Sequence, residues 1–253
     1  MNSITVKDTV LGEASPKTII SIMGADVSEC LVTVREGKEA GVDCFEWRAD
    51  FNECRHDPAA MIELGRALAA ELSDKPLLFT FRSTSQGGND EFSAQEYFEL
   101  TRAIIEAEVI DMVDIETWIG DELVGELCSC AHKHGLVALV SYHDFSGTPA
   151  TEWMVNLMNH MLELGADIPK CAVMAHDAAD ALRLLAATEE VHRTREVPLL
   201  TMAMGREGSI TRLAGEYFGS ALTFCSLAKS SAPGQVDARL ARTIMDELHS
   251  VLA

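Results

Sequence analysis

Apolar and polar positions along the chain follow two alternating patterns. Short apolar, β-branched runs predict strands, and the longer runs between them repeat apolar residues at helical spacing. The strands are expected at residues 18–23, 44–48, 77–82, 112–115, 137–142, 169–174, 199–204 and 221–224. The helices are expected to begin near Val27, Pro58, Ser93, Glu122, Pro149, Asp177, Ile210 and Val236.

Several predicted boundaries carry local signals. Gly41 and Gly135 each stand between a helical run and a strand, the position of a glycine that ends a helix. Ser93 and Glu96 have the spacing of a capping box, and Pro149 suits the first turn of a helix. These signals strengthen the alternation of strand and helix.

The last predicted helix, 236–252, carries apolar residues at helical spacing. They are Val236, Leu240, Ile244, Leu248 and Val251. The pattern predicts that this stripe faces the core.

The order of elements predicts the fold class. Eight strands alternating with eight helices are typical of an α/β protein of the (β/α)8 TIM-barrel type. A doubly wound sheet is the alternative, but it usually has fewer units, and no G-x-G-x-x-G opens the first helix. Residues 1–17 predict a short β-hairpin covering the bottom of the barrel, and 18–253 the barrel itself. Without a linker or a low-complexity tract, 1–253 is expected to be a single domain.

Composition and charge narrow the class of partner. The chain has a net charge of −20, with 47% hydrophobic and 24% charged residues. So acidic a surface argues against nucleic acid and anionic membranes as partners. No apolar run approaches the ~18 residues of a membrane span, and the start of the chain does not resemble a signal peptide. The odd count of seven cysteines fits reduced thiols, so a cytoplasmic location is expected.

Polar residues gather where the predicted strands end. In a (β/α)8 barrel these ends form one rim, where the active site lies. The rim residues are Glu46, Arg48, Arg82, Asp114, Glu116, His143, Lys170, Arg212, Ser231 and Gln235. The sequence therefore predicts one polar pocket.

Lys170 stands at the head of an apolar strand, where a charged side chain is costly. One interpretation is that its ammonium snorkels to water. The other is a buried amine that is neutral when it reacts, with burial and nearby arginines favouring the neutral form. Such an amine forms a Schiff base with a ketone, and His143 is suited to moving the neighbouring proton. This chemistry requires no metal and no organic cofactor.

Other interpretations of the same rim remain open. Asp114 and Glu116 share a strand face and suit either a metal site with His143 or ion pairs with the barrel arginines and lysine, which we favour. A different class I Schiff-base enzyme, such as an aldolase, shares the lysine. A barrel that only binds a carboxylate ligand shares the arginines.

Six motifs together resemble the type I 3-dehydroquinate dehydratases of the shikimate pathway. They are "FEWRADF", "FTFRS…GG", "SYHDF…TP", "ADIPKCAVMA", "RLAGEYFGSALTF" and "SAPGQ", in order from about residue 18 to the C-terminus. The resemblance implies a lyase of aromatic amino acid biosynthesis that dehydrates 3-dehydroquinate to 3-dehydroshikimate. It also implies a homodimer.

The resemblance implies roles for individual residues. Lys170 is expected to form the imine, and His143 to be the general acid and base. Substrate binding is expected of Ser21, Glu46, Arg48, Arg82, Arg212, Ser231 and Gln235, with Arg212 holding the substrate carboxylate and the last two residues belonging to a lid. One position departs from the family: many members carry glutamate before the double glycine, where this chain has Gln86. An amide there can hydrogen-bond with His143 but cannot act as a base.

Overall fold

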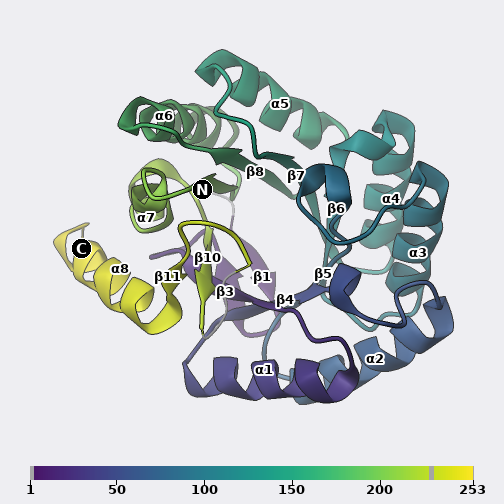
Figure 1. Cartoon of the computed structure of the whole chain (residues 1–253). Helices are drawn as coiled ribbons and strands as arrows, with labels where there is room; N and C mark the ends of the chain where they lie inside the picture. The colour runs from purple at the N-terminus through teal and green to yellow at the C-terminus, as the bar shows by residue number, and fades with distance from the viewer. Residues whose placement is uncertain (1–2, 228–230, 253) are drawn as a thin grey trace.

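The strands and helices form a ring of parallel strands surrounded by helices (Figure 1). The computed structural model describes residues 3–227 and 231–252. The barrel strands are β3 (Lys17–Ile22), β4 (Cys44–Arg48), β5 (Leu77–Thr80), β6 (Met112–Glu116), β7 (Val137–Asp144), β8 (Ile168–Met174), β9 (Leu200–Met204) and β10 (Leu222–Ser226). The helices are α1 (Val27–Glu39), α2 (Pro58–Glu71), α3 (Ala94–Glu106), α4 (Asp121–Lys133), α5 (Thr151–Glu163), α6 (Ala178–Arg195), α7 (Gly215–Phe218) and α8 (Ala238–Leu252).

The strand order confirms the barrel. The sheet runs β11-β10-β3-β4-β5-β6-β7-β8-β9, with β11 (Val236–Asp237) as a short addition to β10. A parallel bridge between Leu199 and Ser220 joins the two ends of the series. Beside it, the backbone N–H of Ala221 donates to the Leu199 carbonyl over 2.7 Å.

The two-residue period of the strands sorts side chains into an outer core and an inner column. Outward-facing residues such as Phe45, Trp47 and Phe79 pack under the helices. The lowest inward layer is apolar and consists of Ile19, Cys44, Leu78, Met112, Leu139, Ile168, Leu200 and Leu222. Two residues further along β3 to β8 the inward side chains are polar, so the apolar layer forms a floor beneath these polar groups.

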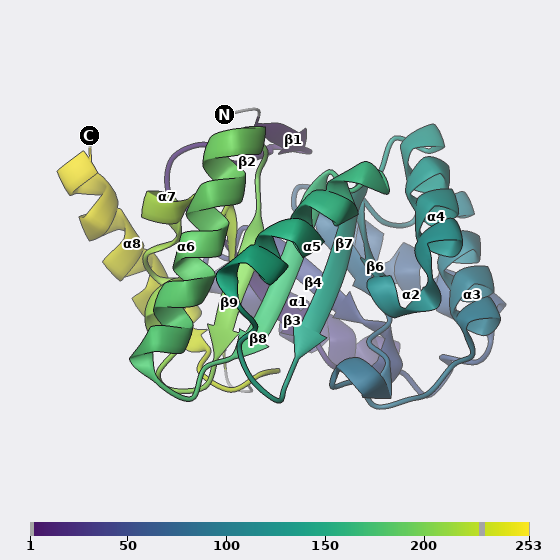
Figure 2. The ribbon, with the colours of Figure 1, turned by 90° about the horizontal axis from the view of Figure 1, so that it is seen from above.

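The predicted N-terminal hairpin is confirmed. Strands β1 (Ile4–Val6) and β2 (Thr9–Leu11) pair antiparallel. Val6 and Leu11 pack against the apolar layer inside the barrel. The hairpin therefore closes the end from which the strands start, opposite their carboxyl ends (Figure 2).

Local signals placed most boundaries correctly. The Ser93–Glu96 capping box forms, and Gly41 and Gly135 have φ of +73° and +70° after their helices. The prediction for Pro149 is wrong, because α5 begins at Thr151.

The expected helix near Ile210 is also wrong in form. A 3₁₀ turn, η4 (Ser209–Arg212), and the short α7 take its place.

The predicted core-facing stripe of the last helix is wrong. The buried residues of α8 are Ala238, Ala241 and Met245, while Leu240 is 53% and Val251 79% exposed. The rotation of the helix is fixed by Arg242, whose guanidinium binds the Asp43 carboxylate, the Thr18 hydroxyl and the Gly41 carbonyl. Small alanines on the buried face let the helix approach the sheet closely. In the described part of the chain, no helix has the length and apolar character needed to cross a membrane.

Candidate active site

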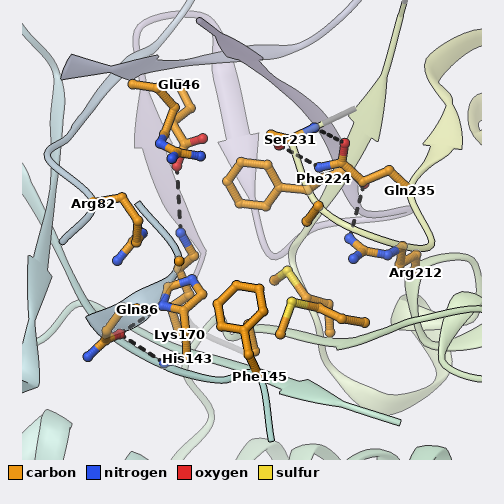
Figure 3. Close-up of a pocket in the computed structure, with 16 residues that line it drawn as sticks. Glu46, Arg82, Gln86, His143, Phe145, Lys170, Arg212, Phe224, Ser231 and Gln235 are labelled. Atoms are coloured by element: carbon orange, nitrogen blue, oxygen red, sulfur yellow. Dashed lines mark hydrogen bonds and ion pairs between the residues drawn. The ribbon is translucent and has the colours of Figure 1, made fainter. Parts of the chain in front are cut away.

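A pocket lies inside the ring at the carboxyl ends of the strands (Figure 3). It brings together eight of the nine predicted site residues: Glu46, Arg48, Arg82, His143, Lys170, Arg212, Ser231 and Gln235. Ser21, the ninth, donates to the Glu46 carboxylate over 2.6 Å, and its hydroxyl oxygen lies 3.0 Å from the Ser231 hydroxyl oxygen. The set is therefore contiguous, although its members span 215 positions, from 21 to 235.

Lys170 is buried in the middle of the polar column. Its side chain is 2% exposed, which excludes the snorkelling interpretation. The Nζ atom donates to Asp114 Oδ2 over 2.7 Å and lies 3.7 Å from Glu46 Oε1. The ring of Phe224 covers it, with Nζ 4.7 Å from the ring centroid.

Two buried carboxylates hold Arg82. Its guanidinium contacts Asp114 at 2.7 Å and Glu116 at 2.5 Å, and it also donates to the Ser141 hydroxyl. Burial raises the pKa of Asp114, but Arg82 and Lys170 outweigh it and leave that pKa well below its usual range. The ion-pair interpretation of Asp114 and Glu116 is confirmed, because both carboxylates contact Arg82 and Asp114 also contacts Lys170.

The expectation that nearby arginines favour the neutral form of Lys170 needs correction, because carboxylates pair with two of those arginines. Arg48 is held by both oxygens of Asp50, at 2.8 and 2.9 Å, and Arg82 by Asp114 and Glu116. Carboxylates therefore offset the cationic field that the sequence suggested. Among the described residues, no group of three or more His, Cys, Asp or Glu side chains is placed to hold a metal ion.

Ser231 and Gln235, the residues of the predicted lid, line one side of the pocket. Gln235 Nε2 donates to the Ser231 hydroxyl over 2.8 Å, and Gln235 Oε1 accepts the Ser231 N–H over 2.9 Å. Through Ser21 this pair connects to Glu46, which also accepts from the Thr80 hydroxyl. Polar hydrogen-bonding groups therefore line this wall.

Gln86 determines which nitrogen of His143 carries a proton. Its Oε1 atom accepts the backbone N–H of His143 over 2.9 Å and lies 3.0 Å from Nδ1 of the same residue. A backbone N–H only donates, so the atom facing it is the amide oxygen, and Nδ1 must then donate to that oxygen. The Nε2 lone pair is left available for proton transfer.

The surroundings of His143 favour the neutral ring. Burial lowers the pKa of His143 well below its ordinary value of 6.5, and the charges of Arg82 and Lys170 lower it further, against a smaller opposing effect of Asp114. His143 is therefore a base at neutral pH.

Arg212 differs from the other two arginines. It ends η4, is 2% exposed, and lies within 4 Å of no carboxylate of the described chain. Two of its nitrogens make long contacts, 3.4 and 3.3 Å, with backbone carbonyls, and its Nε has no partner in the described residues. Burial lowers the pKa of Arg212 to about 10. A buried guanidinium in this state is prepared to bind an anion.

Several residues of the pocket were not predicted. Met202, Met204 and Phe224 form its apolar wall. They lie on the inward face of β9 and β10, so the two-residue period identifies them. Phe145 at the mouth belongs to a loop, and nothing in the sequence pattern distinguishes it.

Comparison with known proteins agrees with this geometry. The model of the family described as type I 3-dehydroquinase matches residues 18–251. The 3-dehydroquinate dehydratase of Salmonella typhimurium strain LT2 is 42% identical over 250 residues, which cover 98% of this chain and 99% of that protein.

Solved structures agree as well. The type I 3-dehydroquinate dehydratase of Clostridium difficile, solved with covalently modified comenic acid, has a TM-score of 0.93 and 38% identity, covering 98% of both chains. The 3-dehydroquinate dehydratase of Geobacillus kaustophilus has a TM-score of 0.95 and 36% identity, covering 98% of this chain and 97% of that one.

Proposed function

The chain belongs to the type I 3-dehydroquinase family and is a 3-dehydroquinate dehydratase; we propose that it performs this dehydration through an imine on Lys170, with His143 as the general acid and base. The observation that carries the proposal is one pocket that holds a buried amine, a neutral histidine and an arginine with no carboxylate partner among the described residues.

The first stage joins substrate and protein. His143 Nε2 accepts a proton from the Lys170 ammonium, and the Nζ lone pair attacks the ketone carbon. The carbinolamine hydroxyl then takes this proton back from His143 and leaves as water. Overall, ammonium plus ketone gives iminium plus water, with no net change in charge or in protons.

The second stage is the elimination. The iminium withdraws electrons and acidifies the neighbouring C2–H. His143 Nε2 removes this proton, and the resulting enamine expels the β-hydroxyl, which takes the proton back from His143 and leaves as water. Water then adds to the conjugated iminium, releasing 3-dehydroshikimate and restoring the Lys170 ammonium.

The remaining residues hold the substrate. Arg212 pairs with the substrate carboxylate, a bidentate role that suits a guanidinium. Glu46, Arg48, Arg82, Ser21, Ser231 and Gln235 supply hydrogen bonds to its oxygens. Met202 and Phe224 line the pocket and limit the space for water around the ring.

The test is turnover of 3-dehydroquinate, followed by the absorbance of the conjugated enone product. We expect Lys170→Ala to abolish turnover. His143→Ala should lower kcat by about 10²- to 10⁴-fold, the range of general acid–base catalysis. Full activity of Lys170→Ala would contradict the proposal.

Two controls in the same assay separate the alternatives. A chelator should leave the rate unchanged, whereas a metal-dependent barrel enzyme would lose activity. Chromatography of the products distinguishes dehydration from the carbon–carbon cleavage of an aldolase.

We propose further that the chain is a single domain, forms a homodimer and works in the cytoplasm on a small-molecule carboxylate. The family resemblance supports the homodimer, and the reduced cysteines support the location. All seven cysteines are free.

A further inference from the structure

The carboxylate of Asp114 touches the amine that forms the imine. Its Oδ2 atom accepts a hydrogen bond from Lys170 Nζ over 2.7 Å, whereas the next carboxylate, Glu46, is 3.7 Å away. Asp114 is 1% exposed, and its pKa lies well below its usual range. It therefore remains an anion and does not store the proton that Lys170 releases.

Asp114 is held in place from three sides. Its Oδ1 atom accepts from the Ser141 hydroxyl over 2.5 Å, and its Oδ2 atom accepts from Arg82 over 2.7 Å. From the helix side, the Tyr97 hydroxyl donates to the Asp114 carbonyl and accepts the Glu116 N–H, both over 3.1 Å. The carboxylate is fixed and does not follow Lys170 if that side chain moves.

The charge balance of the imine step gives this contact a chemical consequence. Ammonium and iminium both carry one positive charge on Nζ, and the iminium keeps one N–H. A fixed anion beside Nζ stabilises both states, and its oxygen accepts that last N–H. Because a C=N bond does not rotate, one N–H bond to a fixed oxygen sets the plane of the iminium and the direction of its neighbouring C2–H.

We propose that Asp114 is a catalytic residue: it is the counter-ion of the Lys170 iminium and orients the imine plane relative to His143. This inference rests on the proposed imine at Lys170. A purely structural role as a partner of Arg82 is the alternative, and Glu116 provides the comparison. Glu116 also binds Arg82, at 2.5 Å, and is also fully buried, but no contact joins it to Lys170 in the described chain.

The experiment compares Asp114→Asn with Glu116→Gln. Each variant removes one buried carboxylate from Arg82, and only the first removes the acceptor at Nζ. Each protein is saturated with 3-dehydroquinate and reduced with borohydride, and the covalently modified fraction is read by intact mass. Steady-state kcat and KM and urea unfolding are measured in parallel.

We expect Asp114→Asn to lower the trapped fraction and to lower kcat by about 10- to 100-fold, the range for losing a hydrogen bond to a charged group. The change in KM should be smaller than that in kcat, because Asp114 contacts the reacting nitrogen rather than the substrate's binding groups. Glu116→Gln should trap an adduct at close to the wild-type fraction, even if it is equally destabilised. Equal trapping by wild type and Asp114→Asn, or equal losses in both variants, overturns the assignment.

A second variant covers the case in which Asp114→Asn does not fold. Asp114→Glu keeps the charge but displaces the carboxylate oxygens by one methylene. Its trapped fraction should therefore lie between that of the wild type and zero. A wild-type trapped fraction in this variant contradicts the assignment. If wild-type protein itself forms no adduct, the proposed function fails first, and that outcome is distinct from a failure at Asp114.

Discussion

At the scale of single residues, the chemistry depends on which groups carry charge. Lys170 is paired with Asp114, His143 is neutral, and Arg212 has no carboxylate partner in the described structure. Burial contributes to each of these states, together with Asp114 at Lys170 and with the charges of Arg82 and Lys170 at His143. The pocket thus holds a base and an anion site in the states that their proposed roles require, and an amine that becomes the nucleophile once it loses a proton.

The lowered pKa of His143 predicts that the enzyme keeps its activity at mildly acidic pH. Because burial and nearby cations hold the pKa of His143 well below 6.5, the base form persists as the pH falls through 6.5. We expect kcat/KM to stay level from pH 7 to pH 6.5 and to decline only well below this value. A pH series of initial rates measures this, and a decline centred at or above pH 6.5 would contradict it.

Gln86→Glu is the matched variant for the pH profile. A carboxylate beside Nδ1 stabilises the imidazolium and so raises the pKa of His143. The acid limb of kcat/KM should move to higher pH in the variant. An acid limb that does not move would show that Gln86 does not control the titration of His143.

At the scale of elements, the loop after β5 joins two parts of the rim. Gly87 has φ of +85°, and a Cβ added there would come within 2.3 Å of the Phe145 ring in the loop after β7. The same loop positions Gln86 against His143. Close packing at this glycine therefore determines the geometry of the base.

Gly87→Ala and Gly41→Ala separate backbone strain from this packing. Both glycines have positive φ, so each alanine should destabilise the fold by roughly 1–2 kcal/mol. A Cβ at Gly41 meets nothing within 4 Å. We expect Gly87→Ala alone to lower kcat/KM, by about 10- to 100-fold through displacement of the base. Urea unfolding and kinetics measure the two effects, and equal kcat/KM values would show that the Phe145 contact is unimportant.

The barrel and its inner polar column were predictable because both follow from periodicity. The two-residue period places Glu46, Arg48 and Lys170 inward once the strands are known. The capping box at Ser93 depends on adjacent residues and was also correct.

Features that depend on contacts between distant segments were not predictable in this way. The rotation of α8 follows from the bond between Arg242 and Asp43, which are 199 residues apart. The sequence indicated that Asp114 would pair with an arginine or the lysine of the barrel, but not which of these cations its oxygens would contact. The distances between neighbouring strands of the barrel decide which side chains touch, and a single sequence does not give these distances.

At the scale of the whole molecule, the net charge of −20 opposes the approach of an anionic substrate. The charges of the site do not offset this field, because its four cations are matched by four carboxylates. They are Arg48, Arg82, Lys170 and Arg212 against Glu46, Asp50, Asp114 and Glu116. The attraction between Arg212 and the substrate carboxylate therefore acts only at short range, once the substrate is in the pocket.

This balance predicts a salt dependence of the reaction. The Debye length falls from about 30 Å at 0.01 M salt to about 8 Å at 0.15 M, so added salt screens the distant negative charges more than the direct contact with Arg212. We expect kcat/KM to rise over this interval and kcat at saturating substrate to stay level. A steep fall in kcat/KM would show instead that a cationic field around the pocket governs the encounter.

The central claim is that the amine of Lys170 forms a covalent bond with the substrate. The most direct measurement is to reduce the protein with borohydride in the presence of 3-dehydroquinate, digest it, and locate the added mass by peptide sequencing. We expect one modification, on Lys170 within the peptide that contains "IPKCAVM". An adduct at another lysine, or unmodified protein after active turnover, would contradict it.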